Sequence, residues 1–420
     1  MMFKLWFSIP LWQRVIGALV LGTVFGWVWK EFALFGGASP ESIKWIGDLF
    51  IKAIKMLIVP LIFFSLVSGI AALGDLKKLG NVGGKALMIF GGTAALSVSL
   101  GLTLATVTQP GIGLNIELPE GASVPEPATT TAVDMILSMV TDNPVATMAE
   151  GQVLPLIIFA LLFGISVLMA GREALPIVKA MDAGSAVMQR MTMIVMELAP
   201  FGVFALMVWV AGTLDPAVLI GLLQVIGLNY LGCFIIILFV YPAIIKFIAK
   251  LPIVDFYRGI VDAQVVAFST ASSNAALPVT LRCVQRNLGV SRSVSSFVVA
   301  LGATINMNGT AMYLGLVAVF GAQVYGIDLT WTSYVLIALT ATLGSVGAAG
   351  IPGSGLIMLT LVLTSIGVPL ETVALVAGIN HVMDMMRTAT NVTGDATVAV
   401  AVGRMAGEID IEEYVSADDI

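Results

Sequence analysis

Long apolar segments recur along this chain and constrain its fold more than any other feature. A helix that crosses about 30 Å of hydrocarbon needs roughly 20 consecutive apolar residues. Only 11% of the residues are charged, whereas soluble domains carry about 25%, so a chain this long cannot cover itself with a water-exposed surface. The sequence therefore predicts an all-α, multi-pass protein of the lipid bilayer. Segments of sufficient length occur near 11–30, 48–72, 84–108, 152–171, 190–212, 217–249, 293–323 and 371–403.

The basic residues predict how these segments are oriented, because Lys and Arg in short loops mark the cytoplasmic side. Lys4 and Arg14 place the N-terminus in the cytoplasm. No basic residue occurs between Lys85 and Arg172, which places the loop 109–133 outside.

Two further apolar segments, 255–290 and 330–368, are predicted to enter the membrane and return to the same side. Basic clusters at 246–258 and 282–292 flank the first segment. A single crossing would put them on opposite faces, whereas a re-entrant hairpin keeps both in the cytoplasm. The second segment has no basic flank and suits a hairpin that opens outward. The predicted fold has eight transmembrane helices plus two re-entrant helical hairpins with inverted repeats, in the inner (plasma) membrane with both termini cytoplasmic.

The tips of both hairpins are rich in small, polar and flexible residues. The first tip spans 269–278 and includes Pro278, and the second spans 344–355 with Gly-Ile-Pro-Gly at 350–353. Non-helical backbone in lipid leaves unpaired amide and carbonyl groups, so it persists only inside protein or around a ligand. Paired segments interrupted by Gly and Pro therefore indicate a transporter site. Close packing of small residues between helices is the alternative interpretation.

One face of the last apolar segment carries a polar stripe. At about 100° per residue its side chains fall within an arc of roughly 100°. An Asp or Arg at the bilayer centre costs about 3 kcal/mol on insertion scales. Three charges on one face therefore need partners and indicate a functional site. His381, just off the stripe, is expected to be a packed, hydrogen-bonded residue, with a proton carrier as the alternative. The stripe consists of Asn380, Asp384, Arg387, Thr388, Asn391 and Asp395.

Two interpretations of the charges in the stripe remain open. Asp384 and Arg387 can neutralise each other as an internal ion pair that holds helices together. Alternatively, the two charges match a zwitterion with an extra carboxylate, with Asp384 taking the ammonium group and Arg387 binding the distal carboxylate through its planar fork. Asp395 lies roughly two to three turns deeper, and it suits a cation whose oxygen shell is completed by backbone carbonyls.

A second polar cluster occupies 304–310 inside another apolar segment. Gly309 in a helix interior is destabilising by about 1 kcal/mol relative to Ala. Local unwinding there would free the carbonyl groups of Gly302 and Asn306. Hydrogen bonding between helices by the Asn and Thr side chains is an equally good interpretation.

Together these motifs resemble the dicarboxylate/amino acid:cation symporter family, which contains the excitatory amino acid transporters and their prokaryotic homologues. The resemblance rests on the serine-rich first tip, Asn-Met-Asn-Gly-Thr at 306–310, Gly-Ile-Pro-Gly at 350–353, Asp-Met-Met-Arg-Thr at 384–388 and Asn-Val-Thr-Gly-Asp at 391–395. Their order and spacing match over nearly the whole chain. The resemblance implies a homotrimer in which a transport domain slides as an elevator past a scaffold, with the second hairpin as a gate.

The acidic residues at the end of the chain are most simply interpreted as a solvated tail.

The resemblance also implies a division of the chain into domains. The expected parts are scaffold helices 1 and 2 (1–81), transport-domain helix 3 (82–109), an external loop with scaffold helices 4 and 5 (110–215), the rest of the transport domain with helices 6 to 8 and both hairpins (216–407), and an acidic cytoplasmic tail (408–420).

Carried over by position, the resemblance implies a role for each site residue. Asp384 would bind the amino group of the substrate and Arg387 its side-chain carboxylate, while Asn391 and Ser273 would hold the main carboxylate. Neutral amino acid members lack the arginine and dicarboxylate members lack the aspartate, so the presence of both favours L-aspartate or L-glutamate. The other expected substrate-binding residues are Ser272, Thr310, Ile351, Gly355 and Thr388. One sodium site would comprise Gly302, Asn306, Asn391 and Asp395, and a second Thr304, Met307, Ser345, Val346 and Ala348.

The chain departs from the family pattern at several positions. Asn308 replaces a common aspartate linked to a third sodium site, Asn380 replaces another frequent aspartate, and Ala94 replaces a frequent serine. Ala271 and Met385 occupy places where many relatives carry an extra arginine. These departures argue against a third sodium ion. Asp395 is retained at a position where asparagine is associated with proton-coupled bacterial members, so we expect Na⁺ coupling with fewer than three ions, two being the expected number.

Coupling to H⁺ on the same scaffold is the alternative function. An intramembrane hydrolase is a third functional hypothesis. The chain has one histidine, no HExxH motif and no GxSxG elbow, so no enzymatic activity is expected. No nucleic-acid partner is expected either.

Overall fold

The computed structural model describes residues 9–32, 38–71, 82–114, 137, 140–347, 350 and 352–416. Within these residues the regular secondary structure is helical, and the one strand-like pairing is an isolated antiparallel bridge between Val290 and Ile409. The all-α prediction is therefore confirmed for the described part of the chain.

The described helices occur in the following order along the chain. The first half contains α2 (Leu11–Phe32), α3 (Lys44–Ala71), α5 (Val82–Thr108), α7 (Pro144–Glu150), α8 (Val153–Ala170), α9 (Leu175–Met196), α10 (Ala199–Thr213) and α11 (Pro216–Ile235), with 3₁₀ turns at Pro40–Ile43 and Gly171–Ala174. The chain continues from α11 through π-helical turns at Ile236–Val240 and Ile244–Ala249 that flank α12 (Tyr241–Ala243). The second half contains α13 (Ile253–Thr270), α14 (Ser273–Arg282), a π-helical turn at Cys283–Asn287, α15 (Arg292–Ile305), α16 (Asn308–Val324), α17 (Trp331–Gly347), α18 (Ser354–Ser365), α19 (Glu371–Ala406) and α20 (Ile411–Val415).

Several helical stretches of the described chain are long and apolar enough to cross a membrane. α10 and α18 are apolar but shorter. This agrees with a membrane protein, while the division into eight spanning helices and two re-entrant hairpins stays a prediction. The six long stretches are Leu11–Phe32, Pro40–Ala71, Val82–Thr108, Pro155–Met196, Pro216–Ala249 and Arg292–Val324.

The structure corrects one predicted segment. Instead of a single helix near 190–212, α9 begins at Leu175 and α10 is a separate helix that begins at Ala199. Pro200 lies in the first turn of α10, where its missing N–H needs no partner, but inside a continuous helix it would break the hydrogen-bond ladder. The first half of α9 exposes charged residues such as Lys179, so it does not stand out as an apolar segment.

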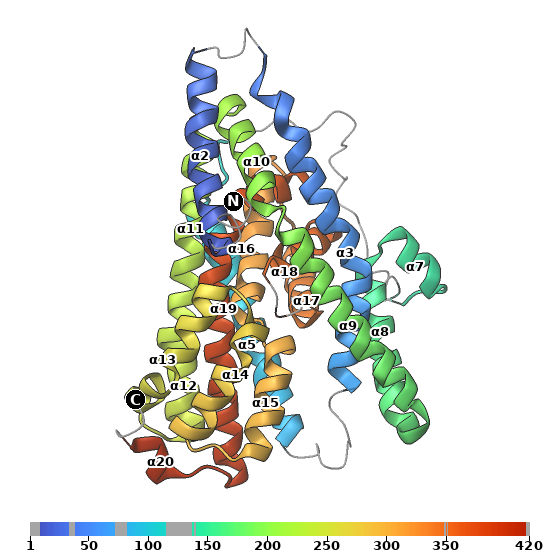
Figure 1. Cartoon of the computed structure of the whole chain (residues 1–420), viewed down its shortest axis with the longest axis vertical. Helices are drawn as coiled ribbons and strands as arrows, with labels where there is room; N and C mark the ends of the chain where they lie inside the picture. The colour runs from blue at the N-terminus through green and yellow to red at the C-terminus, as the bar shows by residue number, and fades with distance from the viewer. Residues whose placement is uncertain are drawn as a thin grey trace.

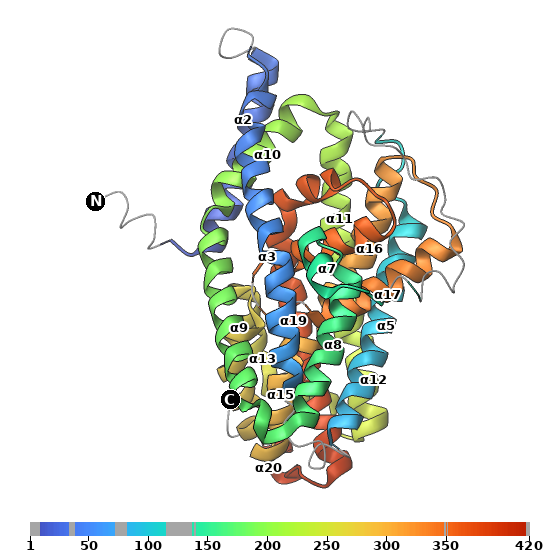
Figure 2. The same cartoon turned by 90° about the vertical axis from the view of Figure 1, so that its right-hand side faces the viewer.

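Helix α19 runs through the middle of the molecule (Figures 1 and 2). It packs against α10, α11, α13, α15 and α16. Every residue from Thr372 to Gly403 except Val382 is buried. The polar stripe therefore faces neither lipid nor water, and its polar groups must be satisfied inside the protein.

Each predicted hairpin region folds as two helices packed side by side. α13 packs on α14, and α17 packs on α18. The two tips meet, because the hydroxyl of Ser272 donates a hydrogen bond of 2.8 Å to the carbonyl of Gly350. The N–H of Asn274 donates one of 3.0 Å to the same oxygen. Two segments 78 residues apart in sequence are thus joined directly at their tips.

The predicted disruption inside segment 293–323 is present, but it lies before Gly309. Asn306 and Met307 are the two non-helical residues between α15 and α16. The carbonyl of Gly302 still accepts a hydrogen bond of 2.8 Å from the N–H of Asn306, so unwinding does not free it as expected. The break instead leaves the N–H groups at the start of α16 available to side chains of α19.

Candidate functional site

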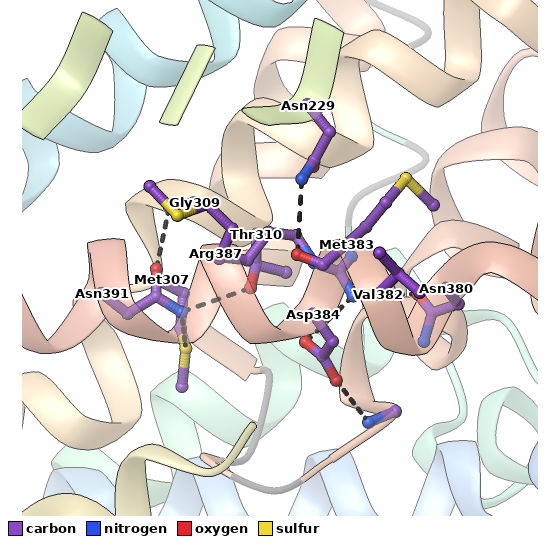
Figure 3. Close-up of polar contacts among 12 residues, drawn as sticks. Asn229, Met307, Gly309, Thr310, Asn380, Val382, Met383, Asp384, Arg387 and Asn391 are labelled. Carbon is purple, nitrogen blue, oxygen red and sulfur yellow. Dashed lines mark hydrogen bonds and ion pairs between the residues drawn. The ribbon is translucent and has the colours of Figure 1, made fainter. Parts of the chain in front are cut away.

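Arg387 lies at the centre of the polar stripe and is completely buried, with 0% of its surface exposed. Its Nη2 lies 2.9 Å from Asp384 Oδ1 and donates a hydrogen bond of 2.8 Å to Asn380 Oδ1 (Figure 3). The guanidinium carbon lies 3.8 Å from the centre of the Tyr313 ring, which is a cation–π contact. The internal ion pair that the sequence left open is therefore present in this structure.

The ion pair uses only part of the guanidinium. Among the described residues, neither Nε nor Nη1 of Arg387 has a hydrogen-bond partner, although a buried charged donor without a partner is costly. Gly355 of α18 lies against Nη1, because a Cβ at this glycine would be only 2.6 Å from that nitrogen. Nη1 is cis to Cδ and the Nε–H points to the Nη2 side, so Nε and Nη1 lie on different edges of the guanidinium. Each can donate its own charge-assisted hydrogen bond to a carboxylate oxygen.

Asp384 connects the stripe to the second hairpin tip. Its Oδ2 accepts a hydrogen bond of 2.9 Å from the N–H of Gly353, while its Oδ1 faces Arg387. Met196, the last residue of α9, also packs against Gly353. An ammonium group placed beside Asp384 would compete for these oxygens with both Arg387 and the hairpin tip.

Asn391 joins α19 to the break between α15 and α16. Its Oδ1 accepts a hydrogen bond of 2.8 Å from the N–H of Gly309, in the first turn of α16. Its Nδ2 donates to Met307 Sδ at 3.2 Å and to Thr310 Oγ1 at 3.4 Å (Figure 3). Asn391 thereby satisfies one of the unpaired N–H groups of a helix N-terminus and holds the start of α16 beside Arg387.

A second polar cluster lies deeper along α19, around Asp395. Its Oδ1 accepts a hydrogen bond of 2.9 Å from Asn306 Nδ2, which also donates to the carbonyl of Asn391 at 3.3 Å. Asp395 packs so closely on Gly302 that a Cβ there would collide with it. Asn306 Oδ1 is buried and has no partner in the described part of the chain. Carboxylate, carboxamide and carbonyl oxygens are the ligands that hard cations prefer, so this cluster offers ligands of the type that a hard cation takes.

Asn308 lies in a third, uncharged hydrogen-bonded unit. Its Nδ2 donates to Tyr241 Oη at 3.0 Å, and that hydroxyl donates to the carbonyl of Thr390 at 3.0 Å. All three residues have 0% of their surface exposed. No charged side chain belongs to this unit, in contrast to the cluster around Asp395.

The structure brings most of the predicted site residues together. The four members of the first predicted sodium set are linked to one another by hydrogen bonds or direct packing. Ile351, predicted to bind substrate, lies outside the described residues. The other predicted substrate-binding residues are all buried around α19 and the hairpin tips: Ser272, Ser273, Thr310, Gly355, Asp384, Arg387, Thr388 and Asn391.

The second predicted sodium set is not joined by comparable contacts. The hydroxyl of Thr304 donates to the carbonyl of Leu301 within α15, and that of Ser345 donates to the carbonyl of Thr342 within α17. Met307, its third described member, binds Asn391 through sulfur. Ala348 and the side chain of Val346 lie outside the described residues. This set stays a prediction.

Sequence reasoning missed several parts of the site. The N–H of Gly353 is a backbone group, so its contact with Asp384 leaves no trace in the residue types. The contact of Tyr241 with Asn308 joins segments that are distant in sequence, so local sequence did not indicate it. Tyr313 had a signal, because it lies one helical turn beyond Thr310 and so shares its face. His381 is buried as expected, but in the described structure both of its ring nitrogens lack the expected hydrogen-bond partner.

Comparison with known proteins gives a consistent result over almost the full length. The profile of the sodium:dicarboxylate symporter family matches residues 11–405. A protein of Bacillus subtilis named proton/glutamate-aspartate symporter is 32% identical, covering 96% of this chain and 97% of its own. A proton/sodium-glutamate symport protein of Geobacillus stearothermophilus is 32% identical and covers 96% of each chain. A C4-dicarboxylate transport protein of Rhizobium johnstonii is 34% identical, covering 98% of this chain and 92% of its own.

Proposed function

Because the chain belongs to the sodium:dicarboxylate symporter family, we propose that it is a symporter that carries L-aspartate or L-glutamate and is driven by a sodium gradient. Family membership makes it a membrane transporter coupled to a cation, with an acidic amino acid or dicarboxylate as substrate. The choice of amino acid, ion and mechanism is the proposal.

The observation that carries the proposal is the unpartnered part of Arg387 beside Asp384. The distal carboxylate of the substrate would accept a hydrogen bond from Nη1 of Arg387, which lies against Gly355 and has no other partner among the described residues. The ammonium group would bind Asp384, within reach of the same guanidinium. Ser273 at the first tip and Asn391 on α19 would hold the main carboxylate. The substrate would thus supply a hydrogen-bond partner that the buried arginine lacks.

Asp384 also favours an amino acid over a C4-dicarboxylate, the substrate named for the Rhizobium relative. A dicarboxylate would bring a second negative group toward Asp384 without an ammonium group to neutralise it. Two like charges about 4 Å apart repel by roughly 4 kcal/mol at an effective dielectric constant of 20. An ammonium group at the same place turns this repulsion into attraction.

Coupling to Na⁺ is supported by the oxygen-rich cluster of Asp395, Asn306, Asn391 and Gly302. We assign a second ion to the set that contains Thr304 and extends to the second hairpin. The uncharged unit around Asn308 offers no third negative site. Proton coupling is the second candidate, because two of the relatives carry both proton and glutamate in their names.

The proposed architecture follows the same family. Eight spanning helices and two re-entrant hairpins would form a homotrimer in the inner (plasma) membrane, with both termini cytoplasmic. The scaffold would consist of 1–81 and 110–215, and the transport domain of 82–109 and 216–407. The transport domain would move as an elevator. The second hairpin would be the gate, because its tip is held to Asp384 by a hydrogen bond that a substrate ammonium group can displace.

Uptake into proteoliposomes tests the proposal. Labelled L-aspartate and L-glutamate are supplied with an inward sodium gradient at equal pH, or with an inward proton gradient without sodium. Accumulation with sodium alone is expected. Accumulation driven by the proton gradient alone would favour proton coupling over sodium coupling. Uptake of succinate in place of either amino acid would contradict the assignment of Asp384 to the ammonium group.

A further inference from the structure

Residues 408–416 of the acidic tail, which was expected to be a solvated end, are folded against the lower end of the molecule (Figure 1). The N–H of Ser291 donates a hydrogen bond of 3.0 Å to the carbonyl of Glu408, and the N–H of Asp410 donates one of 2.8 Å to the carbonyl of Gly289. The hydroxyls of Ser291 and Ser293 both donate to Glu408 Oε2 at 2.5 Å. The tail is thus docked on the connector between the first hairpin and α15 by main-chain and side-chain bonds.

The same tail also reaches the other end of the first hairpin. Tyr414 Oη donates a hydrogen bond of 2.9 Å to the carbonyl of Pro252, the residue before α13. Its side chain is 1% exposed and belongs to a buried cluster with Phe256 and Leu288. Residues 408–415, which we call the clasp, therefore bind both the entry and the exit of the first hairpin.

Gly289 allows the backbone of the clasp to approach the connector closely. Its φ of +62° is a left-handed conformation that L side chains rarely adopt. A Cβ at this position would also collide with the carbonyl oxygen of Asp410. Both the turn and the approach of the two backbones thus require glycine.

We propose that the clasp, by binding both ends of the first hairpin, is what holds this hairpin rigid as a wall of the substrate site. A hairpin bound at both ends cannot swing about its base, and its tip serines Ser272 and Ser273 keep their position. Gly289 and Tyr414 are positioning residues, because they lie at the base of the hairpin and act through α13 and α14. The role of the tip as a substrate wall rests on the proposed function, whereas the mechanical role of the clasp does not.

Hydrogen exchange of the full-length protein in detergent tests the mechanical role. Gly289→Ala is expected to raise exchange at residues 408–415 and, with them, at 272–293 by about tenfold, while α16 stays protected. Gly326→Ala is the matched control, because its φ of +65° is similar but a Cβ there meets nothing within 4 Å. If the clasp exchanges faster and the first hairpin does not, the proposal is overturned.

Two further variants keep the test decisive if Gly289→Ala does not fold. Tyr414→Phe keeps the ring and removes only the hydrogen bond to Pro252. Hydrogen exchange of the clasp and the first hairpin is therefore expected to rise less than in Gly289→Ala. Val290→Cys with Ile409→Cys, in a background with alanine at the two native cysteines, places a disulfide across the antiparallel bridge. Faster exchange of the first hairpin in the oxidised form than in the reduced form would contradict a stabilising clasp.

The locked variant also tests the role in transport. A fixed wall predicts that the oxidised protein takes up substrate at the rate of the reduced one. A locked protein that is inactive and recovers with reductant would show that the clasp must open in each cycle, which would overturn the proposal. In Gly289→Ala the apparent KM for substrate is expected to rise more than kcat falls. If wild-type protein transports neither amino acid, the proposed function fails, while the exchange result still decides the mechanical role.

Discussion

The N–H of Gly353 donates a hydrogen bond of 2.9 Å to Asp384, the carboxylate that also lies 2.9 Å from Arg387. One side chain therefore neutralises the buried arginine and holds the tip of the second hairpin. A ligand that brings an ammonium group to Asp384 and a carboxylate to Arg387 replaces both interactions at once. Ligand binding and the position of the hairpin tip are thus linked through a single carboxylate.

Asp384→Asn separates these two roles, because asparagine keeps an oxygen acceptor for Gly353 but loses the charge. We expect the affinity for L-aspartate to fall about 100-fold, in the range measured for truncated buried charge pairs. Inhibition by succinate should improve at the same time, since the repulsion of its second carboxylate is removed. Competition against labelled L-aspartate in proteoliposomes measures both. An unchanged preference for the amino acid would mean that Asp384 does not contact the ammonium group.

Arg387→Ala removes the group that would bind the distal carboxylate and leaves Asp384 without its partner. Uptake of both acidic amino acids should fall more than about 100-fold, and a small neutral amino acid such as L-serine should become a substrate. Exposed Arg286 provides a control, because Arg286→Ala removes the same charge from the surface. Retained affinity for L-aspartate in Arg387→Ala would refute the pocket assignment.

The all-helical character of the fold was predictable because hydrophobic length and helical periodicity are properties of local sequence. The stripe on α19 follows from periodicity alone, and the polar cluster at 304–310 marked a real helix break. The position of that break was not predictable, since it is fixed by Asn391 bonding to the N–H of Gly309 from another helix.

Other parts of the site depend on contacts between distant segments and left no local signal. Gly353 binds Asp384 through its backbone, and any residue type carries that N–H group. The clasp was expected to be a solvated tail because its composition is acidic, yet Tyr414 buries its ring against the first hairpin. α9 was overlooked because it is amphipathic and exposes charges such as Lys179.

Gly355→Ala tests the space beside Arg387 without changing any charge. A methyl group there would lie 2.6 Å from Nη1, so the guanidinium must shift and Nε and Nη1 lose their position. We expect the affinity for L-aspartate to fall about tenfold or more, a size typical of overpacking, while Na⁺ affinity changes little. Gly227→Ala in α11 is the matched control, because a Cβ at that helical glycine meets nothing within 4 Å. Equal effects of the two variants would argue against a ligand at Nη1.

Asp395→Asn tests the cation cluster. It preserves an acceptor for Asn306 but removes the one carboxylate of the set, so the Na⁺ concentration for half-maximal aspartate binding should rise at least about tenfold. Calorimetric titration of aspartate at several Na⁺ concentrations measures this shift. Asn308→Asp is the informative comparison, because it adds a carboxylate to the uncharged unit beside Tyr241. Sodium dependence that is the same in wild type and Asp395→Asn would assign the ion elsewhere.

The pH dependence of stability reports on the clasp through Glu408. Hydrogen bonds from Ser291 and then Ser293 lower the pKa of this carboxyl below its ordinary value. Because the folded pKa is depressed, the stabilisation is present above the pKa of the unfolded chain, about 4.3, and is lost as the pH falls through the folded value.

Glu408→Gln should therefore melt at a lower temperature than wild type at neutral pH, and the two melting curves should converge as the pH falls through the folded pKa of Glu408. Thermal unfolding in detergent, followed by fluorescence between neutral and acidic pH, measures the difference. Glu412→Gln removes the same charge from the same tail and controls for net charge. A difference between Glu408→Gln and wild type that stays constant across this range would show that Ser291 and Ser293 do not stabilise the ionised carboxylate.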